Sequence, residues 1–167
     1  VVNVVSEKDG LPADTVKCIT QGADGDYYIG TTGAMSVVSM SGGLSVKSII
    51  DNITYAVSAD SDKNGNVAVV SDNGKLSIVK KDTVISDYSA IDGSNYTTCS
   101  FDEDGILYAA TSSGNIDKYK VDNGILTFSE SVSCHELNNL NKLEFIDSDL
   151  TRGESRFVCG VMGIGYY

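Results

Sequence analysis

The stretch Asp24-Gly25-Asp26-Tyr27-Tyr28-Ile29-Gly30-Thr31 decides the fold, because an acidic glycine turn leads into a run of strand-forming residues and the combination then recurs. The turn glycine returns at Gly65 and again at Gly105, so the interval is 40 residues both times. A period of about 40 residues is typical of proteins built from stacked repeats. The chain is therefore expected to consist of copies of one structural unit.

Each unit is predicted to hold four short strands separated by polar turns. The predicted strands, in order of their place in the unit, cover residues 15–19, 53–57 and 96–100; 27–31, 67–71 and 107–111; 34–38, 75–79 and 115–119; and 44–49, 83–86 and 125–128. Four strands in about 40 residues are the content of one β-propeller blade. The second strand carries small residues such as Gly30 and Ala110, which we expect in a crowded position beside the propeller axis.

A fourth unit is predicted near the end of the chain. Strands are expected at 142–146 and 156–160, with the start of another at 163–167, and a longer stretch over 147–155 replaces the acidic turn. The unit boundaries lie at about 6–50, 51–91, 92–133 and 134–167, and residues 1–5 read as the outer strand of a preceding or closing blade. The predicted fold class is all-β, a propeller-like array of about four four-stranded blades.

Three interpretations of this blade count stay open, because closed propellers hold about four to eight blades. The chain is a partial propeller, or two copies complete one ring, or the chain closes alone with residues 1–5 as the last outer strand. An unclosed array leaves an apolar sheet face uncovered, so self-association through the end blades is expected.

Composition and charge exclude several other classes. The 167 residues carry 12 basic and 23 acidic side chains, for a net charge of -11, without a block of Lys and Arg. A nucleic-acid-binding groove needs clustered cations, so no nucleic-acid partner is predicted. No apolar run approaches the roughly 20 residues that a membrane-spanning helix needs. The four cysteines form no CxxC pair, and we interpret them as buried, reduced thiols.

No catalytic, cofactor or metal site is predicted. The segment from Asp60 to Gly65 resembles the opening of a calcium loop, but Ser71 stands where that loop needs a bidentate Glu, so we interpret it as a tight acidic turn. His135 is the only histidine and has no nucleophile at a meaningful spacing. The chain is predicted not to be an enzyme.

Ligand binding, if the fold follows other propellers, is expected on the loops at one end of the central channel. These loops are short, polar and rich in hydroxyl and amide groups. The candidate residues in them are Thr31, Thr32, Asp72, Asn73, Ser112 and Ser113. Such loops suit a neutral polar ligand, for example a polysaccharide fragment.

The first unit resembles the two-component regulator propeller repeat. The resemblance lies in Asp9-Gly10-Leu11-Pro12-Ala13-Asp14-Thr15-Val16 and in residues 24–33, with Tyr28 in place of the usual Trp. It implies an extracytoplasmic sensor module of a bacterial signalling protein, with a glycan as its ligand. The alternative hypothesis is a protein-interaction or adhesion scaffold, and the third is a propeller lyase or hydrolase.

Overall fold

Three four-stranded antiparallel sheets follow one another along the chain, as the repeat predicts. The computed structural model describes residues 4–134, 140–149 and 154–161. Its elements are the 3-10 helix η1 (Glu7–Asp9) and the strands of blade A, which are β1 (Val16–Gln21), β2 (Tyr27–Thr31), β3 (Met35–Ser39) and β4 (Ser45–Ile50). The described part of the chain contains no helix with the length and apolar character needed to cross a membrane.

Blades B and C repeat the same meander, in which each strand pairs with the next. Blade B consists of β5 (Ala56–Ser61), β6 (Asn66–Ser71), β7 (Leu76–Lys80) and β8 (Thr83–Tyr88). Blade C consists of β9 (Tyr96–Phe101), β10 (Ile106–Thr111), β11 (Asn115–Asp122) and β12 (Ile125–Ser133). A two-stranded sheet of β13 (Leu140–Asp149) and β14 (Glu154–Val161) follows. The all-β class and the four-stranded unit are thus confirmed.

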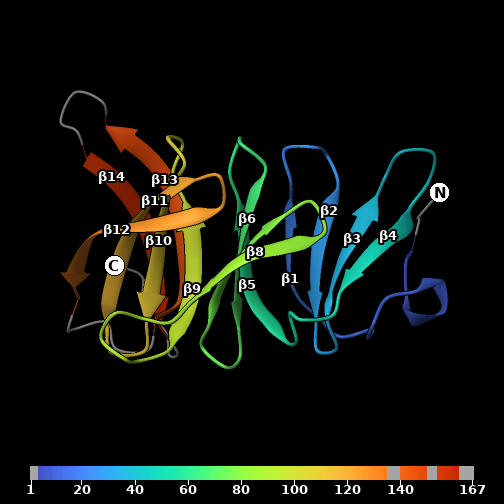
Figure 1. Ribbon diagram of the computed structural model, residues 1–167, viewed down its shortest axis with the longest axis horizontal. Helices are drawn as coiled ribbons and strands as arrows, with labels where there is room; N and C mark the ends of the chain where they lie inside the picture. Colours follow the sequence, from blue (N-terminus) through green and yellow to red (C-terminus); the bar gives the residue numbers. More distant parts are fainter. Residues whose placement is uncertain (1–3, 135–139, 150–153, 162–167) are drawn as a thin grey trace.

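The blades meet through their first strands, with β5 packed between β1 and β9, and β13 against β9 (Figure 1). This differs from the expectation that the second strand lies beside the axis. In blade B the second strand is instead the most buried of the four, and every residue of β6 is buried. A second strand has sheet neighbours on both sides and, in blade B, a neighbouring blade on each face, and small residues such as Ala68 suit that crowding.

Apolar side chains fill both junctions between blades. Between blades A and B, Met35 and Val37 pack with Val67, Val69 and Val79, all almost inaccessible to solvent. The junction between blades B and C contains larger side chains, including aromatic ones. Its buried residues include Ile78, Phe101, Leu107 and Tyr119. Burial of such surfaces, worth about 25 cal/mol per Å² of apolar area, holds the blades face to face.

Hydroxyl and carboxyl groups add polar contacts between the first strands. Ser58 Oγ lies 3.1 Å from Thr98 Oγ1, and Ser100 Oγ donates to Asp60 Oδ2 at 3.0 Å. The Asp60 carboxylate also accepts the backbone N–H of Phe101 at 2.8 Å. These partners are 40 or 41 residues apart, so the sequence repeat sets the register between blades.

The acidic turns are confirmed as backbone-capping turns. Asp62 Oδ1 accepts the N–H groups of Asn64 at 2.9 Å and Asn66 at 2.8 Å. Asp102 Oδ1 does the same for Asp104 at 3.0 Å and Ile106 at 2.9 Å. A carboxylate that accepts hydrogen bonds from the backbone two and four residues further on fixes the shape of the turn.

Several predicted boundaries are wrong. Strand β5 begins at Ala56 rather than at residue 53, because Ile53 turns back to Ile50 (N–O distance 3.1 Å) and Tyr55 has a φ of 48°. Much of 147–155 is strand rather than turn, since β13 and β14 pair as far as Asp149 and Glu154. Val4 and Val5 lie in no strand, while residues 1–3 and 163–167 are outside the described part of the chain.

Blade A keeps one face away from blade B, and part of it is exposed. On this face Ile19 pairs with Ile29 across β1 and β2. Ser36 of β3 pairs with Ile29 on one side and with Ile49 of β4 on the other, so the four residues form one row across the sheet. Leu11 covers the region near Ile29, yet Ile19 remains 57 % exposed and Ile49 43 % exposed. The predicted uncovered apolar face is therefore present at this end of the described blades.

Candidate functional site

The six residues predicted to bind a ligand lie in the β2–β3, β6–β7 and β10–β11 turns, at the lower end of the blades in Figure 1. Thr31 is fully buried, and its hydroxyl is used within the turn. It accepts the N–H groups of Gly33 and Ala34, each at 3.2 Å, and donates to the Ala34 carbonyl at 2.8 Å. Thr31 therefore shapes its turn rather than presenting a free hydroxyl.

Ser113 is likewise held within the protein, by Asp92 in the connection from β8 to β9. The Asp92 carboxylate accepts the Ser113 hydroxyl, the Ser94 hydroxyl at 2.6 Å and the Asn115 amide at 2.8 Å. These donors lower the pKa of Asp92, with the Ser113 hydroxyl the largest cause. The network orders the surface between blades B and C.

The remaining predicted residues show a mixture of roles. Ser112 Oγ accepts the N–H of Asn95 at 3.3 Å, and Asn73 Oδ1 accepts the N–H of Lys75 at 3.1 Å. Thr32 is partly exposed and Asp72 is exposed. The three turns occupy equivalent places in their blades, and the binding of a ligand there stays a prediction.

A groove that the sequence did not predict lies at the opposite, upper end, where the β1–β2 turn of blade A faces the β5–β6 and β7–β8 turns of blade B. It consists of two hollows, each of about 330 Å³. The lysine hollow is lined by Gly22, Ala23, Asp24, Tyr28, Lys63, Asn64, Gly65, Lys80 and Lys81. The aspartate hollow is lined by Asp24, Asp26, Tyr28, Val37, Lys47, Ser48, Lys81 and Asp82. We call the two together the A–B groove.

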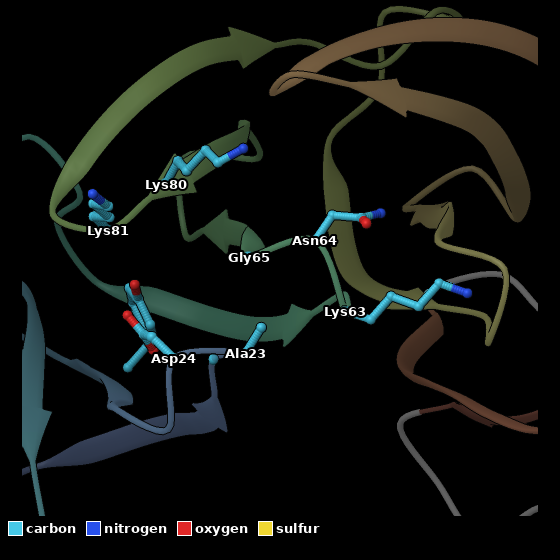
Figure 2. A pocket seen from close by; sticks show the side chains of 9 residues that line it. Ala23, Asp24, Lys63, Asn64, Gly65, Lys80 and Lys81 are labelled. Atoms are coloured by element: carbon cyan, nitrogen blue, oxygen red, sulfur yellow. The ribbon is translucent and has the colours of Figure 1, made fainter.

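The walls of the lysine hollow come from both blades. Figure 2 shows Lys80 and Lys81 on one side of the hollow and Ala23 and Asp24 on the other. The Lys63 side chain extends away from both, and its Nζ donates to the Glu103 carbonyl at 3.0 Å. Lys80 and Lys81 carry the ammonium groups of this hollow that make no hydrogen bond or ion pair among the described residues.

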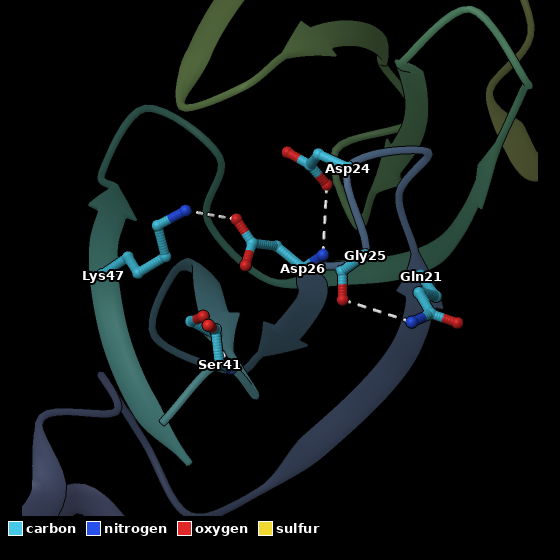
Figure 3. Close-up of polar contacts among 7 residues, drawn as sticks. Gln21, Asp24, Gly25, Asp26, Ser41 and Lys47 are labelled. Atoms are coloured by element: carbon cyan, nitrogen blue, oxygen red, sulfur yellow. Dashed lines mark hydrogen bonds and ion pairs between the residues drawn. The ribbon is translucent and has the colours of Figure 1, made fainter. Parts of the chain in front are cut away.

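The aspartate hollow contains an ion pair between Asp26 and Lys47, drawn in Figure 3. The Asp26 side chain is only 11 % exposed, whereas that of Lys47 is 52 % exposed. The hydrogen bond to Asp26 raises the pKa of Lys47, so the Lys47 ammonium group keeps its charge at neutral pH. Asp24 caps the same turn, because its Oδ1 accepts the N–H of Asp26 at 3.1 Å.

Tyr28 lines both hollows and is only 1 % exposed. Its hydroxyl makes no hydrogen bond within the described chain. Burial, followed by the charges of Asp24, Asp26 and Asp82, raises its pKa to about 12, so the hydroxyl keeps its proton at neutral pH.

A glycine makes room for this ring. A Cβ on Gly22 would lie 2.7 Å from the Tyr28 ring, which is too close for any side chain. Gly22 stands where the two later turns have Asp62 and Asp102. In blade A, glycine thus replaces the aspartate that caps the turn in the other two blades, and the Tyr28 ring occupies the space that a side chain at position 22 would need.

Lys81 has a backbone conformation that side chains disfavour. Its φ is +59°, in the left-handed region where glycine is the unstrained residue. The corresponding turn of blade A contains Gly42 and Gly43, and that of blade C contains Asn123 and Gly124. Blade B thus has a lysine at a place where its neighbours have glycine or asparagine, and this lysine lines both hollows.

Sequence reasoning missed this groove although two signals were available. The absence of the turn carboxylate at Gly22 is one departure from the repeat, and the presence of Lys81 in a turn where the neighbouring blades have glycine or asparagine is another. Neither indicates a site by itself, because Gly22 and Lys81 are 59 positions apart and only the packing of two blades brings them to one groove.

The remaining candidates from the sequence show no site chemistry. The free cysteines comprise the buried Cys99 and the partly buried Cys18 and Cys134. Burial raises the pKa of the Cys18 thiol to about 11 and also raises that of Cys99. Within the described ranges, no three His, Cys, Asp or Glu side chains are arranged to hold a metal ion. His135 lies outside the described residues, as do the side chains beyond Cys134.

Comparison with known proteins identifies the fold. No protein-family model matches the chain, and no curated protein sequence is detectably similar. Sqt1 from Saccharomyces cerevisiae is similar in structure, with a TM-score of 0.66 at 13% identity. The WD40 repeats of RRP9 give 0.67 at 10% identity, and the structure of U3-55K gives 0.70 at 9%. These alignments cover 81%, 78% and 89% of this chain but only 38%, 42% and 53% of those proteins.

Proposed function

We propose that this chain is a protein-interaction scaffold of the β-propeller class, and that the A–B groove is where it binds its partner. The observation that carries the proposal is the pair of joined hollows that share Asp24, Tyr28 and Lys81. They contain the Tyr28 hydroxyl and the ammonium groups of Lys80 and Lys81, which make no hydrogen bond or ion pair among the described residues. The similarity to the WD40 repeats of RRP9 agrees with this role through the fold.

The shape and lining of the groove favour a peptide segment over a small molecule. Each of the two hollows contains charged residues of both signs: Asp24, Lys80 and Lys81 in one, and Asp26, Lys47 and Asp82 in the other. Two adjoining hollows along a blade junction suit an extended chain segment, which can place successive side chains in successive hollows.

The sensor role, the polysaccharide ligand and the extracytoplasmic location stay predictions that rest on the resemblance of the first unit. The solved structures support the scaffold hypothesis better, because they share the fold without indicating a sugar site. The chain spans about half or less of their length, so a partial propeller remains part of the proposal.

Selection of peptides against the chain tests the proposed function. A random heptapeptide library displayed on phage is panned on the immobilised protein, and selected peptides are measured by fluorescence polarisation. Asn64→Trp would place an indole against the lysine hollow. Asp104→Trp introduces the same side chain in the equivalent turn of blade C, in place of an aspartate, and serves as the control.

We expect Asn64→Trp to weaken binding by about tenfold or more, equivalent to ~1.4 kcal/mol, and Asp104→Trp to leave it nearly unchanged. Failure to select any binding peptide overturns the proposal. So does a set of peptides that tolerates both substitutions equally, since such peptides bind elsewhere.

A further inference from the structure

The outward face of blade A has the layout of the faces with which blades B and C meet the blade before them. In every blade one row of paired residues crosses the four strands. From the first strand to the fourth, the rows are Ile19, Ile29, Ser36 and Ile49 in blade A; Ala59, Val69, Ser77 and Asp87 in blade B; and Cys99, Ala109, Asp117 and Ser131 in blade C. Val69 packs in the junction with blade A, and Ala109 packs in the junction with blade B. The row of blade A faces away from blade B, at one end of the line of blades in Figure 1.

The connection that leads into each blade adds an apolar side chain to the same face. Ile53, before blade B, is buried with Val69 in the junction of blades A and B. Ala90, before blade C, is buried in the next junction. Leu11, before blade A, is buried against Ile29 in the same way. Blade A therefore carries one half of a blade junction, without a second sheet on it among the described residues.

Two isoleucines make the row of blade A more apolar than the rows that are already covered. Its fourth position is Ile49, where blade B has Asp87 and blade C has Ser131. Its first position is Ile19, which is exposed, whereas the equivalent Cys99 of blade C is buried. Exposed apolar side chains on a face that is built as a junction are typical of an interaction surface.

The Ser36 hydroxyl, in the middle of this row, is buried and lacks a hydrogen-bond partner among the described residues. In blade B the equivalent Ser77 hydroxyl donates to Asp87 at 2.6 Å, and blade C has the pair reversed, with a serine hydroxyl donating to Asp117 at 2.7 Å. Ile49 cannot accept a hydrogen bond from Ser36. Since buried hydroxyl groups are normally satisfied, we expect the molecule that covers this face to supply the partner.

A second copy of this chain is the occupant that the architecture favours. We call the face that a blade turns toward the next one its forward face. Blade B covers the forward face of blade A, blade C covers that of blade B, and the β13–β14 sheet lies against blade C through contacts of β13 with β9 and β10. No further sheet covers the β13–β14 sheet within the described ranges. A second copy can therefore bring its β13–β14 end to the outward face of blade A.

The number of sheets agrees with a ring of two copies. Contact between two different ends of a molecule produces either a closed ring or an open fibre. The described chain has four sheets, so two copies have twice that number, which is within the range of about four to eight blades in closed propellers. The alignments also cover only 38%, 42% and 53% of the similar solved structures, so one chain corresponds to about half of such a fold or less.

We infer that the outward face of blade A binds the β13–β14 end of a second copy, and that two copies close one β-propeller through two such contacts. Burial of Ile19 and Ile49 drives the association, and the second copy supplies the hydrogen-bond partner of Ser36. This surface is separate from the A–B groove, so the inference goes beyond the proposed function and does not depend on it.

Sedimentation-velocity ultracentrifugation of the full chain over a range of protein concentrations tests the inference. We expect an equilibrium between monomer and dimer without larger species, because a closed ring has no free end. Each copy has a net charge of -11, so added salt should strengthen the association by screening the repulsion between copies. A chain that stays monomeric at every concentration and salt level overturns the inference, and a continuous series of larger species overturns the closed ring.

A matched pair of variants separates this surface from general effects of charge. Ile49→Asp should raise the dissociation constant by about tenfold or more. It introduces the carboxylate that blade B has at Asp87, within the row that contains Ser36, so the monomer should keep its fold in circular dichroism. Ile91→Asp adds the same charge at an exposed isoleucine between β8 and β9 and should leave the dimer unchanged. If the two variants weaken the dimer equally, the inference is wrong.

Hydrogen–deuterium exchange distinguishes the ring from other pairings of two copies. On dimerisation, protection should increase in β1 and β4 of blade A and in β13 and β14 together, while blade B stays unchanged. An increase in blade A alone would mean that two blade A faces pack against each other, and the contact with the β13–β14 end would then be wrong.

Discussion

Replacement of Lys81 by glycine is expected to stabilise the folded protein and to weaken the binding of a peptide in the A–B groove. Loss of a buried contact would instead lower the stability. In the left-handed region an L residue with a Cβ costs roughly 1–2 kcal/mol. The φ of +59° places Lys81 in this region. Its side chain is exposed and makes no hydrogen bond or ion pair with the described residues, so few favourable interactions are lost.

Glycine returns part of this gain, because it is more flexible in the unfolded chain by about 0.5–1 kcal/mol. The difference leaves Lys81→Gly more stable by about 0.5–1 kcal/mol. For a chain of this length, that corresponds to an increase in melting temperature of roughly 1–4 °C. The measurement is urea unfolding followed by circular dichroism, with the midpoint compared at constant slope.

Two substitutions serve as controls for the strain argument. Lys81→Ala keeps a Cβ at the same φ, so its stability should stay within about 0.5 kcal/mol of the parent chain. Lys80→Gly introduces glycine at the end of strand β7, where it should destabilise by about 0.5–1 kcal/mol. If Lys81→Gly destabilises the protein as much as Lys80→Gly does, the left-handed conformation carries no cost and the reasoning is refuted.

Other predictions concern the blade junction and the exposed face. Gly30→Ala should destabilise by about 1–3 kcal/mol in urea unfolding, because the new methyl would lie 2.5 Å from Cys18 Sγ and 2.7 Å from Ala56 Cβ; a parent-like midpoint contradicts this. Burial raises the Cys18 pKa from 9.0 to about 11, so alkylation of Cys18 by iodoacetamide should stay slow at pH 9. Because the thiol of the unfolded chain ionises at a lower pH than that of the folded chain, the free energy of unfolding should fall as the pH rises from 9 to 11. Labelling of Cys18 at the rate of a free thiol at pH 9 would show that the folded thiol is not protected. Ile19→Lys should reduce self-association in size-exclusion chromatography with light scattering, and a parent chain that stays monomeric at all concentrations argues against the uncovered face as an association surface.

The errors in strand position have local physical causes. The residues around Ile53 read as a strand because they are β-branched and aromatic, yet Ile53 is 1 % exposed and belongs to a turn that packs into the junction of blades A and B. The left-handed backbone of Tyr55 then delays β5 to Ala56. Propensity describes what a segment prefers in isolation, and packing between blades overrides it here.

The innermost position was assigned to the wrong strand for a related reason. Small residues in β2 and β6 signal crowding correctly, because in blades A and B the second strand is more buried than the first. In blade C the first strand β9 is more buried than β10. The first strands instead meet through polar side chains such as Ser58, Thr98 and Asp60. Sequence alone does not distinguish a strand crowded by neighbouring blades from one at the axis.

The sequence by itself determined the repeat, the four strands of each unit and the acidic turns, because these depend on alternation and on contacts within a few residues, such as those of the Asp62 carboxylate. Only the tertiary structure decided where the groove lies. Gly22 clears space for Tyr28 within blade A, and Lys81 comes from a turn of blade B, so their meeting depends on how two sheets pack. The burial of the Tyr28 side chain is a property of that packing, since a tyrosine in a strand pattern carries no sign of what its ring will pack against.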